Sequence, residues 1–240
     1  MSEHNIHHHS RHPIRSFVLR QGRLTPGQQY ALDNLWERYG VDPPVGVLDL
    51  DALFGRRAPR ILEIGFGNGE SLAAMAMAQP ELDYLGIEVH RPGVGHLLLL
   101  ARQQGLQNLR IMAIDAVEVI ERQLPDACLD RIQIFFPDPW PKQRHHKRRL
   151  IQPAFIEQIT HKLKPGACLH LATDWEDYAH HMLAVLYAAE GLVNTVTEGG
   201  FAARPGYRPV TKFERRGERL GHPVRDLIFR KSCLPSGARE

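Results

Sequence analysis

The chain has 240 residues, 43% of them hydrophobic, which is enough for one α/β domain with a sizeable core. Its net charge of +3 indicates no particular partner, and its three cysteines lack metal-ligand spacing, which argues against a disulfide framework or zinc ribbon and favours a reducing compartment. Neither the apolar segment of a signal peptide nor an uncharged apolar run of about 18 residues is present, so we expect a cytoplasmic protein without a membrane span.

The first 40 residues divide into a tail and a basic arm. Residues 1–14 are polar and rich in histidine, and we expect a disordered tail without a metal site, because no cysteine or aspartate nearby completes a coordination shell. Residues 15–40 begin with arginines and continue into a helix predicted over 25–39, with Pro26 near its start. The arm is either a solvated extension that docks on the domain or a contact for a polyanion.

Residues 41–240 are predicted to form a single domain. Short apolar runs alternate with helical patterns, which predicts an α/β fold with a mostly parallel seven-stranded sheet and helices on both faces. The predicted strands are 60–65, 83–89, 109–115, 130–136, 168–174, 192–197 and 225–231, and the predicted helices are 70–79, 92–104, 116–123, 150–163 and 175–190. The long irregular segment 199–223 is of the kind that is usually functional or mobile.

The first predicted strand leads into a glycine-rich turn, EIGFGNGE at 63–70. Gly65, Gly67 and Gly69 allow backbone N–H groups to approach a ligand just before a helix begins. The turn departs from the dinucleotide pattern G-x-G-x-x-G, because Glu70 stands at the sixth position, where it would repel a pyrophosphate. Taken alone, the turn also fits an ordinary connection between a strand and a helix.

Carboxylates stand at the ends of four successive predicted strands: Glu63, Glu88, Asp115 and Asp138. Ligands of open α/β sheets bind at this edge, where an acid after the second strand can hold ribose hydroxyls. A nucleoside with a sulfonium and an amino group, S-adenosylmethionine, suits four carboxylates better than a pyrophosphate does. A single acid here is easily explained as a polar strand end that meets water, but four in register are not.

The stretch FFPDPWPKQRHHKRR at 135–149 places one acid before dense positive charge. Pro137 and Pro139 restrict the backbone on either side of Asp138 and so fix the direction of its carboxylate. Trp140 fits stacking on a base and packing as a wall equally well. The cations Arg144, Lys147, Arg148 and Arg149 are predicted to bind phosphates beside the ligand edge, and the alternative is a solvated helix face.

Together, EIGFGNGE, the strand-end Glu88, FFPDPWPK, TKFE at 211–214 and RSFVLRQGRLT at 15–25 resemble the bacterial tRNA (guanine-46-N7)-methyltransferases. The likeness runs from near residue 15 to near residue 231. It implies the Rossmann-like fold of the class I methyltransferases and transfer of a methyl group from S-adenosylmethionine to N7 of guanine 46 in the variable loop of tRNA. The product of the donor would be S-adenosylhomocysteine, and no metal would be needed.

The resemblance also implies site residues. Asp138 would be catalytic at the junction of donor and guanine. The donor would be held by Glu63, Gly65, Gly67, Gly69, Glu88, Asp115 and Asp138. The tRNA substrate would contact Lys142, Asp174, Thr211, Lys212, Phe213 and Glu214. We expect tRNA as the partner and a monomer or homodimer as the working form.

Several alternatives remain open. The first alternative to guanine-46 methylation is another S-adenosylmethionine-dependent RNA methyltransferase. The second is an NAD-dependent dehydrogenase that uses the glycine turn. A small-molecule methyltransferase would not need the three basic segments at 15–24, 142–149 and 204–219. The intact turn and Asp138 argue against a non-catalytic RNA-binding module. Asp174 is a substrate contact, the N-cap of the next helix, or both at once. Glu214 either closes over the donor or pairs with Arg215 or Arg216 on the surface.

Overall fold

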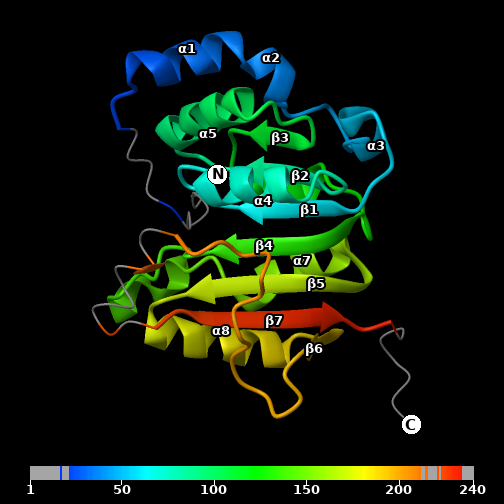
Figure 1. Cartoon of the computed structure of the whole chain (residues 1–240). Coiled ribbons are helices and arrows are strands. Elements are labelled where there is room, and N and C mark those ends of the chain that lie inside the picture. The colour runs from blue at the N-terminus through cyan, green and yellow to red at the C-terminus, as the bar shows by residue number, and fades with distance from the viewer. Residues whose placement is uncertain (1–16, 18–21, 212–213, 216–220, 222, 234–240) are drawn as a thin grey trace, which may run out of the picture.

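The computed structural model describes Phe17 and residues 22–211, 214–215, 221 and 223–233 (Figure 1). The His-rich residues 1–14 and two of the predicted tRNA contacts, Lys212 and Phe213, lie outside this set. Within it, every helix is too short or too polar to cross a bilayer.

In the described part of the chain, seven strands form one sheet in the order β3-β2-β1-β4-β5-β7-β6 (Figure 1). Neighbouring strands from β3 to β5 are parallel, whereas β7 runs antiparallel to both β5 and β6. The strands are β1 (Arg60–Ile64), β2 (Asp83–Ile87), β3 (Leu109–Met112), β4 (Leu129–Phe135), β5 (Leu163–Thr173), β6 (Leu192–Asn194) and β7 (Arg225–Lys231). The predicted α/β fold with a mostly parallel seven-stranded sheet is therefore confirmed.

Helices cover both faces of the sheet. They are α1 (Pro26–Asn34), α2 (Trp36–Tyr39), α3 (Leu50–Phe54), α4 (Glu70–Ala78), α5 (Arg91–Gln103), α6 (Ala116–Arg122), α7 (Pro153–Lys162) and α8 (Glu176–Ala188), with a 3₁₀ helix η1 (Gln143–Arg148). The residues of α4 and α5 share one hydrophobic core with the outer helices α1 and α2, and those of α6, α7 and α8 share the other.

Alternation along the strands creates these two cores. In β1, Leu62 and Ile64 belong to the core under α6–α8, while Ile61, just before Leu62, belongs to the core under α4 and α5. Successive side chains of a strand point to opposite faces, so a strand covered on both sides needs an almost unbroken apolar run. Burying each of these leucines or isoleucines stabilises the fold by roughly 1.5–3 kcal/mol.

Several elements differ from their predicted bounds: β2, β3 and β6, for example, end at Ile87, Met112 and Asn194, before the predicted residues 89, 115 and 197. The predicted helix 25–39 is two helices, with the buried Leu35 between them as the C-cap of α1 and the N-cap of α2. The predicted helix 150–163 begins only at Pro153, since the backbone N–H of Ile151 donates to the Tyr178 hydroxyl outside any helix. The fifth strand starts at Leu163, where it pairs with Leu129, and not at residue 168.

The segment 199–211 crosses the sheet over β7 and β5 (Figure 1, orange). Tyr207 and Val224 pack against the same core as α4 and α5, together with Phe135 and Ala172 of β4 and β5. The irregular segment thus covers the half of this face that α4 and α5 leave open, and it lies directly beside the carboxyl end of β4.

Candidate active site

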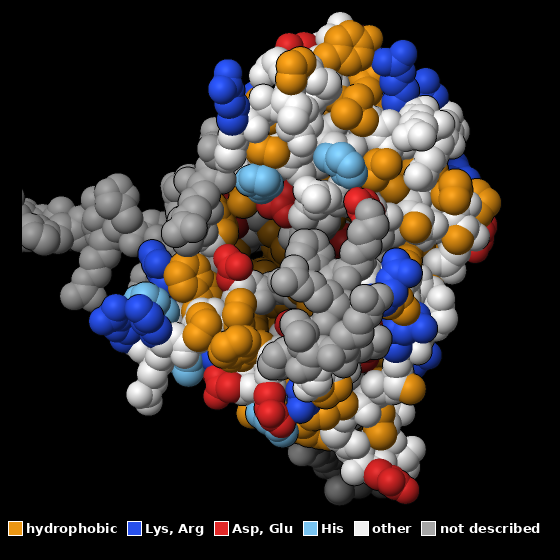
Figure 2. Space-filling model, turned by 60° about the vertical axis from the view of Figure 1, so that its left-hand side comes forward, with side chains coloured by type: hydrophobic (Ala, Val, Ile, Leu, Met, Phe, Trp, Pro, Cys, Tyr) orange, Lys and Arg blue, Asp and Glu red, His pale blue; other side chains and the backbone are white. Residues whose placement is uncertain are grey.

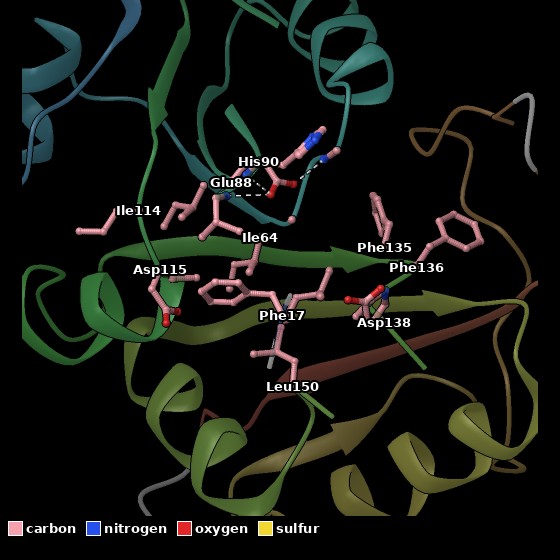
Figure 3. A pocket seen from close by; sticks show the side chains of 17 residues that line it. Phe17, Ile64, Glu88, His90, Ile114, Asp115, Phe135, Phe136, Asp138 and Leu150 are labelled. Atoms are coloured by element: carbon pink, nitrogen blue, oxygen red, sulfur yellow. Dashed lines mark hydrogen bonds between the residues drawn. The ribbon is translucent and has the colours of Figure 1, made fainter. Parts of the chain in front are cut away.

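A pocket of about 450 Å³ opens at the carboxyl edge of the sheet, where the strand order reverses between β1 and β4 (Figures 2 and 3). Its apolar lining includes Ile64, Ile87, Ile114, Ile134 and Leu150. Three of the predicted carboxylates, Glu88, Asp115 and Asp138, also line it. Small-molecule sites typically span about 300–1,000 Å³, with apolar walls and a few placed polar groups, and this pocket has that form.

The glycine turn contributes backbone to the pocket. Gly65, Gly67 and Gly69 all have left-handed φ values, of 76°, 58° and 75°. Gly65 and Gly67 line the pocket, and an added Cβ at either would meet no atom within 4 Å, so the missing side chains leave room for a ligand. Gly69 has a different role: a Cβ there would lie 2.7 Å from Leu97, because it packs α4 against α5.

Glu88 is held by the backbone around it. One carboxylate oxygen accepts from the N–H of Gly67 at 2.9 Å, and the other accepts from the N–H groups of Val89 and His90 at 2.7 and 2.9 Å (Figure 3). These bonds tie the glycine turn to the end of β2. The side chain is therefore oriented before any ligand arrives.

Asp115 follows β3 and lines the pocket across from the glycine turn (Figure 3). It is also the N-cap of α6, since its side chain accepts from the N–H of Val117 at 3.0 Å. This arrangement is compatible with the predicted contact to a ligand amino group.

Asp138 stands in a strained turn after β4. The residues two before and two after it, Phe136 and Trp140, have left-handed φ values of 53° and 44°. Such conformations cost about 1–3 kcal/mol each and persist only where the surroundings hold them. The N–H of Phe136 donates to Ala172 O at 2.8 Å, and Arg149 donates to Pro139 O at 3.0 Å. Partial burial raises the pKa of the Asp138 carboxyl.

Glu63 lies beneath the pocket and does not line it. Its side chain is only 2% exposed, and one oxygen accepts from Gln133 Nε2 at 2.6 Å. Burial, partly offset by the Gln133 hydrogen bond and the charge of Arg131, raises its pKa to about 7. The predicted contact between Glu63 and the donor stays a prediction, and the structure gives this carboxylate a buried partner instead.

The raised pKa of Glu63 predicts a pH-dependent stability. The folded protein binds this proton more tightly than the unfolded chain, so the stabilisation is present below about pH 4.5 and is lost as pH rises to about 7. Glu63→Gln should remove that loss. Its free energy of unfolding should rise relative to wild type, by on the order of 3 kcal/mol at most, between about pH 5 and pH 8. Urea unfolding at both pH values measures this, and a difference that does not change with pH would contradict it.

The cationic stretch forms η1, a short 3₁₀ helix, and its charges divide into two groups. Lys142, Arg144 and Lys147 are exposed, as a phosphate contact requires. Arg148 instead lies over the Trp140 ring at 4.5 Å, and His145 meets that ring edge-on at 5.9 Å. Trp140 is therefore packed within its own loop, which favours a structural role for its ring over stacking on an RNA base.

Arg149 is a correction to the sequence-based expectation. It is 3% exposed, so it cannot bind a phosphate in this arrangement. Its guanidinium pairs with Asp177 of α8, donates to Pro139 O and lies over the Tyr178 ring at 4.8 Å. Arg149 thus fastens the turn that carries Asp138 to the first turn of α8.

The remaining predicted substrate residues separate in space. Asp174 is exposed at the end of β5, and it is not the helix cap, because α8 has Trp175 at its N-cap position without a side-chain bond. Glu214 is 3% exposed, and both its oxygens accept from Arg208 at 2.7 and 2.8 Å. This buried pairing with Arg208 is neither of the two alternatives given for Glu214, and its contact with the substrate stays a prediction. Thr211 is bonded to Glu214 through its hydroxyl.

The pocket includes residues that the sequence analysis did not single out. Phe17, from the basic arm, points into its middle, between Ile64 and Leu150 (Figure 3). His90 and Phe136 complete the wall. Phe17 belongs to RSFVLRQGRLT, one of the segments that carried the resemblance, so that segment could have pointed to Phe17 as a site residue. Elsewhere in the described residues, no group of three or more His, Cys, Asp or Glu side chains is placed to hold a metal.

A family model described as "Putative methyltransferase" matches residues 57–227. The tRNA (guanine-N(7)-)-methyltransferase of Halorhodospira halophila is 61% identical over 217 residues, which cover 90% of this chain and 94% of the relative. The enzyme of that name from Alkalilimnicola ehrlichii is 61% identical over 225 residues, which cover 93% and 94%. This chain belongs to the tRNA (guanine-N(7)-)-methyltransferase family.

Solved structures support the fold of this family member. The 16S rRNA methyltransferase KamB superposes with a TM-score of 0.57 at 17% identity, over 81% of this chain and 99% of KamB. The [4+2]-cyclase SpnF superposes with a TM-score of 0.51 at 18% identity, over 90% and 100%. Because one neighbour is titled a cyclase, the architecture alone does not define the reaction.

Proposed function

We propose that this protein transfers a methyl group from S-adenosylmethionine to N7 of guanine 46 in tRNA. Family membership supports guanine-N7 methylation of tRNA. The observation that carries the donor is the pocket at the strand-order reversal, where the open space at Gly65 and Gly67 meets the carboxylates of Glu88 and Asp115. The family also argues against the alternative of an NAD-dependent dehydrogenase.

The residues of the pocket suit this donor. Gly65 and Gly67 would admit it close to the backbone, Glu88 would accept from ribose hydroxyls, and Asp115 would accept from the adenine amino group. Apolar walls such as Ile114 and Leu150 would cover the purine. When bound, the donor supplies an electrophilic methyl group on a sulfonium.

The chemistry asks little of the protein beyond alignment and charge compensation. Guanine N7 carries a free lone pair, so no base is needed to remove a proton from it, and the gain comes from holding it in line with the methyl carbon. The ring becomes cationic as the bond forms. Asp138, aimed by its strained turn, would compensate that charge, and Phe135, Phe136 and Pro137 in the same wall would exclude water.

The defining experiment identifies the product. The purified chain is incubated with methyl-labelled S-adenosylmethionine and an unmodified tRNA transcript, and the RNA is then digested to nucleosides and analysed by mass spectrometry. We expect one 7-methylguanosine per transcript, and none in a matched transcript with adenine at position 46. Label in another nucleoside, or in the position-46 variant, would instead favour another RNA methyltransferase.

The exposed cations of the 142–147 segment predict a salt effect. Arg144→Ala combined with Lys147→Ala should weaken tRNA binding. The slope of the log association constant against log salt should become less negative by roughly 1–2, because two phosphate contacts are lost. Affinity for S-adenosylhomocysteine should not change. Fluorescence anisotropy across a salt series measures the slope. The matched control is Arg57→Ala with Arg122→Ala, two exposed arginines outside η1; an equal change in both pairs would refute a local contact.

The oligomeric state, monomer or homodimer, and the cytoplasmic location stay predictions. So does the contact of Asp174 with the substrate, which its exposed place at the end of β5 supports.

A further inference from the structure

A buried cluster of charges ties the irregular segment to the sheet beside the pocket. Arg208 lies at its centre, with Glu214 and Asp226 on either side, and all three are at most 3% exposed. Arg208 Nε and Nη2 donate to the two oxygens of Asp226 at 2.8 and 2.9 Å. Its Nη1 and Nη2 donate to the two oxygens of Glu214 at 2.8 and 2.7 Å. One guanidinium therefore bridges the segment and β7.

The cluster extends through a histidine into β5. His170 Nε2 lies 2.7 Å from Asp226 Oδ1, and His170 Nδ1 lies 2.8 Å from the Tyr207 hydroxyl. Burial lowers the pKa of His170, which favours the neutral ring. Both ring nitrogens have partners, so Tyr207 and Arg208, neighbours in the chain, are each fixed to the same pair of strands.

The same guanidinium backs the wall of the pocket. Its carbon lies 5.8 Å from the centre of the Phe135 ring and 5.9 Å from that of Phe136. Both phenylalanines line the pocket, and Asp138 follows Phe136 by two residues. The backbone N–H of Phe136 donates to Ala172 O, and Ala172 pairs with Asp226 across β5 and β7. The Arg208 cluster is thus one contact away from the turn that holds Asp138.

A buried ion cluster is an inefficient way to stabilise a fold. Removing three charges from water costs several kcal/mol per ion, and apolar side chains of similar volume often serve stability equally well. Such a cluster does fix the orientation of its side chains, because forked hydrogen bonds hold both partners. Here they fix Thr211 and Glu214, since Glu214 N donates to Thr211 Oγ1 at 3.1 Å while the Glu214 carboxylate is held by Arg208.

We propose that Arg208 and Asp226 are positioning residues for methyl transfer, and that Glu214 acts through Arg208 and does not touch the RNA. The inference rests on the proposed function. The cluster holds residues 204–211 and Glu214 against Phe135 and Phe136, so that the substrate side of the site keeps a fixed position relative to Asp138. Thr211 and Glu214, the first and last residues of TKFE, would then serve to hold this segment in place.

The test compares neutral variants of similar shape. Asp226→Asn and Glu214→Gln should each lower kcat for tRNA methylation about 10-fold or more, with S-adenosylhomocysteine affinity unchanged. Because both act through one guanidinium, the double variant should lose no more than the worse single one. If Glu214 touches the RNA directly, Glu214→Gln will lose activity and Asp226→Asn will not, and the proposal fails.

A matched control separates positioning from stability. Asp83 is a buried carboxylate, 1% exposed, that pairs with Arg56 at the start of β2, the end of that strand opposite to Glu88. Asp83→Asn should lower the unfolding temperature as Asp226→Asn does, yet leave kcat unchanged. Equal losses of kcat in both variants would overturn the proposal.

Tyr207→Phe, which removes one hydrogen bond to His170, gives a milder variant and should lower kcat without changing the unfolding temperature by more than about 4 °C. If wild type makes no 7-methylguanosine, the proposed function itself fails.

Discussion

Asp138→Ala is expected to reduce kcat for tRNA methylation about 100-fold or more, while the dissociation constants for tRNA and S-adenosylhomocysteine stay near wild type. The carboxylate lines the pocket from a turn whose backbone is strained at Phe136 and Trp140. A charge held in advance where positive charge develops stabilises the transition state more than the ground state. Binding of either substrate alone develops no such charge, so affinity should be spared. Single-turnover kinetics with saturating donor measures the effect on chemistry.

Two further variants sharpen this result. Asp138→Asn keeps the shape and a hydrogen-bond acceptor, so a loss as large as that of alanine would assign the effect to the charge. Asp126→Ala removes an exposed carboxylate that is bonded to Lys162 before β4 begins, and it should leave kcat unchanged. An Asp138→Ala enzyme that methylates tRNA at near wild-type rate would remove Asp138 from the catalytic role.

The meeting of Glu88, Asp115 and Asp138 could be predicted because it follows from local pattern. Each comes one to three residues after the end of β2, β3 or β4, and parallel strands end at one edge of the sheet. Glu63 was predicted to join them at this edge. It lies inside β1, one residue before the strand ends, where its side chain points into the protein and bonds Gln133. Glu63 lay inside the predicted strand 60–65 as well, so nearness to the strand end did not show that its side chain is buried against Gln133.

The fate of individual charges could not be predicted, because it depends on partners far away in the chain. The run KQRHHKRR does not indicate which cation is buried; Arg149 is, because Asp177 of α8 and Tyr178 lie beside it. The pattern of TKFE suggests that Glu214 is a surface acid, but it is buried because Arg208, itself held by Asp226 of β7, pairs with it. Charge density predicts a polyanion-binding face, but only the three-dimensional structure separates its contacts from its supports.

Gly93→Ala is expected to weaken S-adenosylhomocysteine binding about 10-fold or more and to destabilise the fold by roughly 1–3 kcal/mol. Gly93 lies in the first turn of α5, where an added Cβ would be 2.1 Å from the carbonyl oxygen of Gly67. The obstacle is backbone and not a flexible side chain, so either α5 or the glycine turn must move. Gly67 also donates its N–H to Glu88, so a shift of the turn would displace both groups from the pocket.

The matched control is Gly206→Ala. An added Cβ there meets nothing within 4 Å, and the residue has no left-handed φ, so alanine should be accepted without strain. Isothermal titration with S-adenosylhomocysteine and urea unfolding of both variants give the comparison. If Gly93→Ala is as stable as wild type and binds the ligand as wild type does, the close approach of α5 to the glycine turn does not shape the donor pocket. If it is destabilised but still binds normally, α5 has moved away and the turn has kept its place, because the tie between Gly67 and Glu88 is then the stronger constraint.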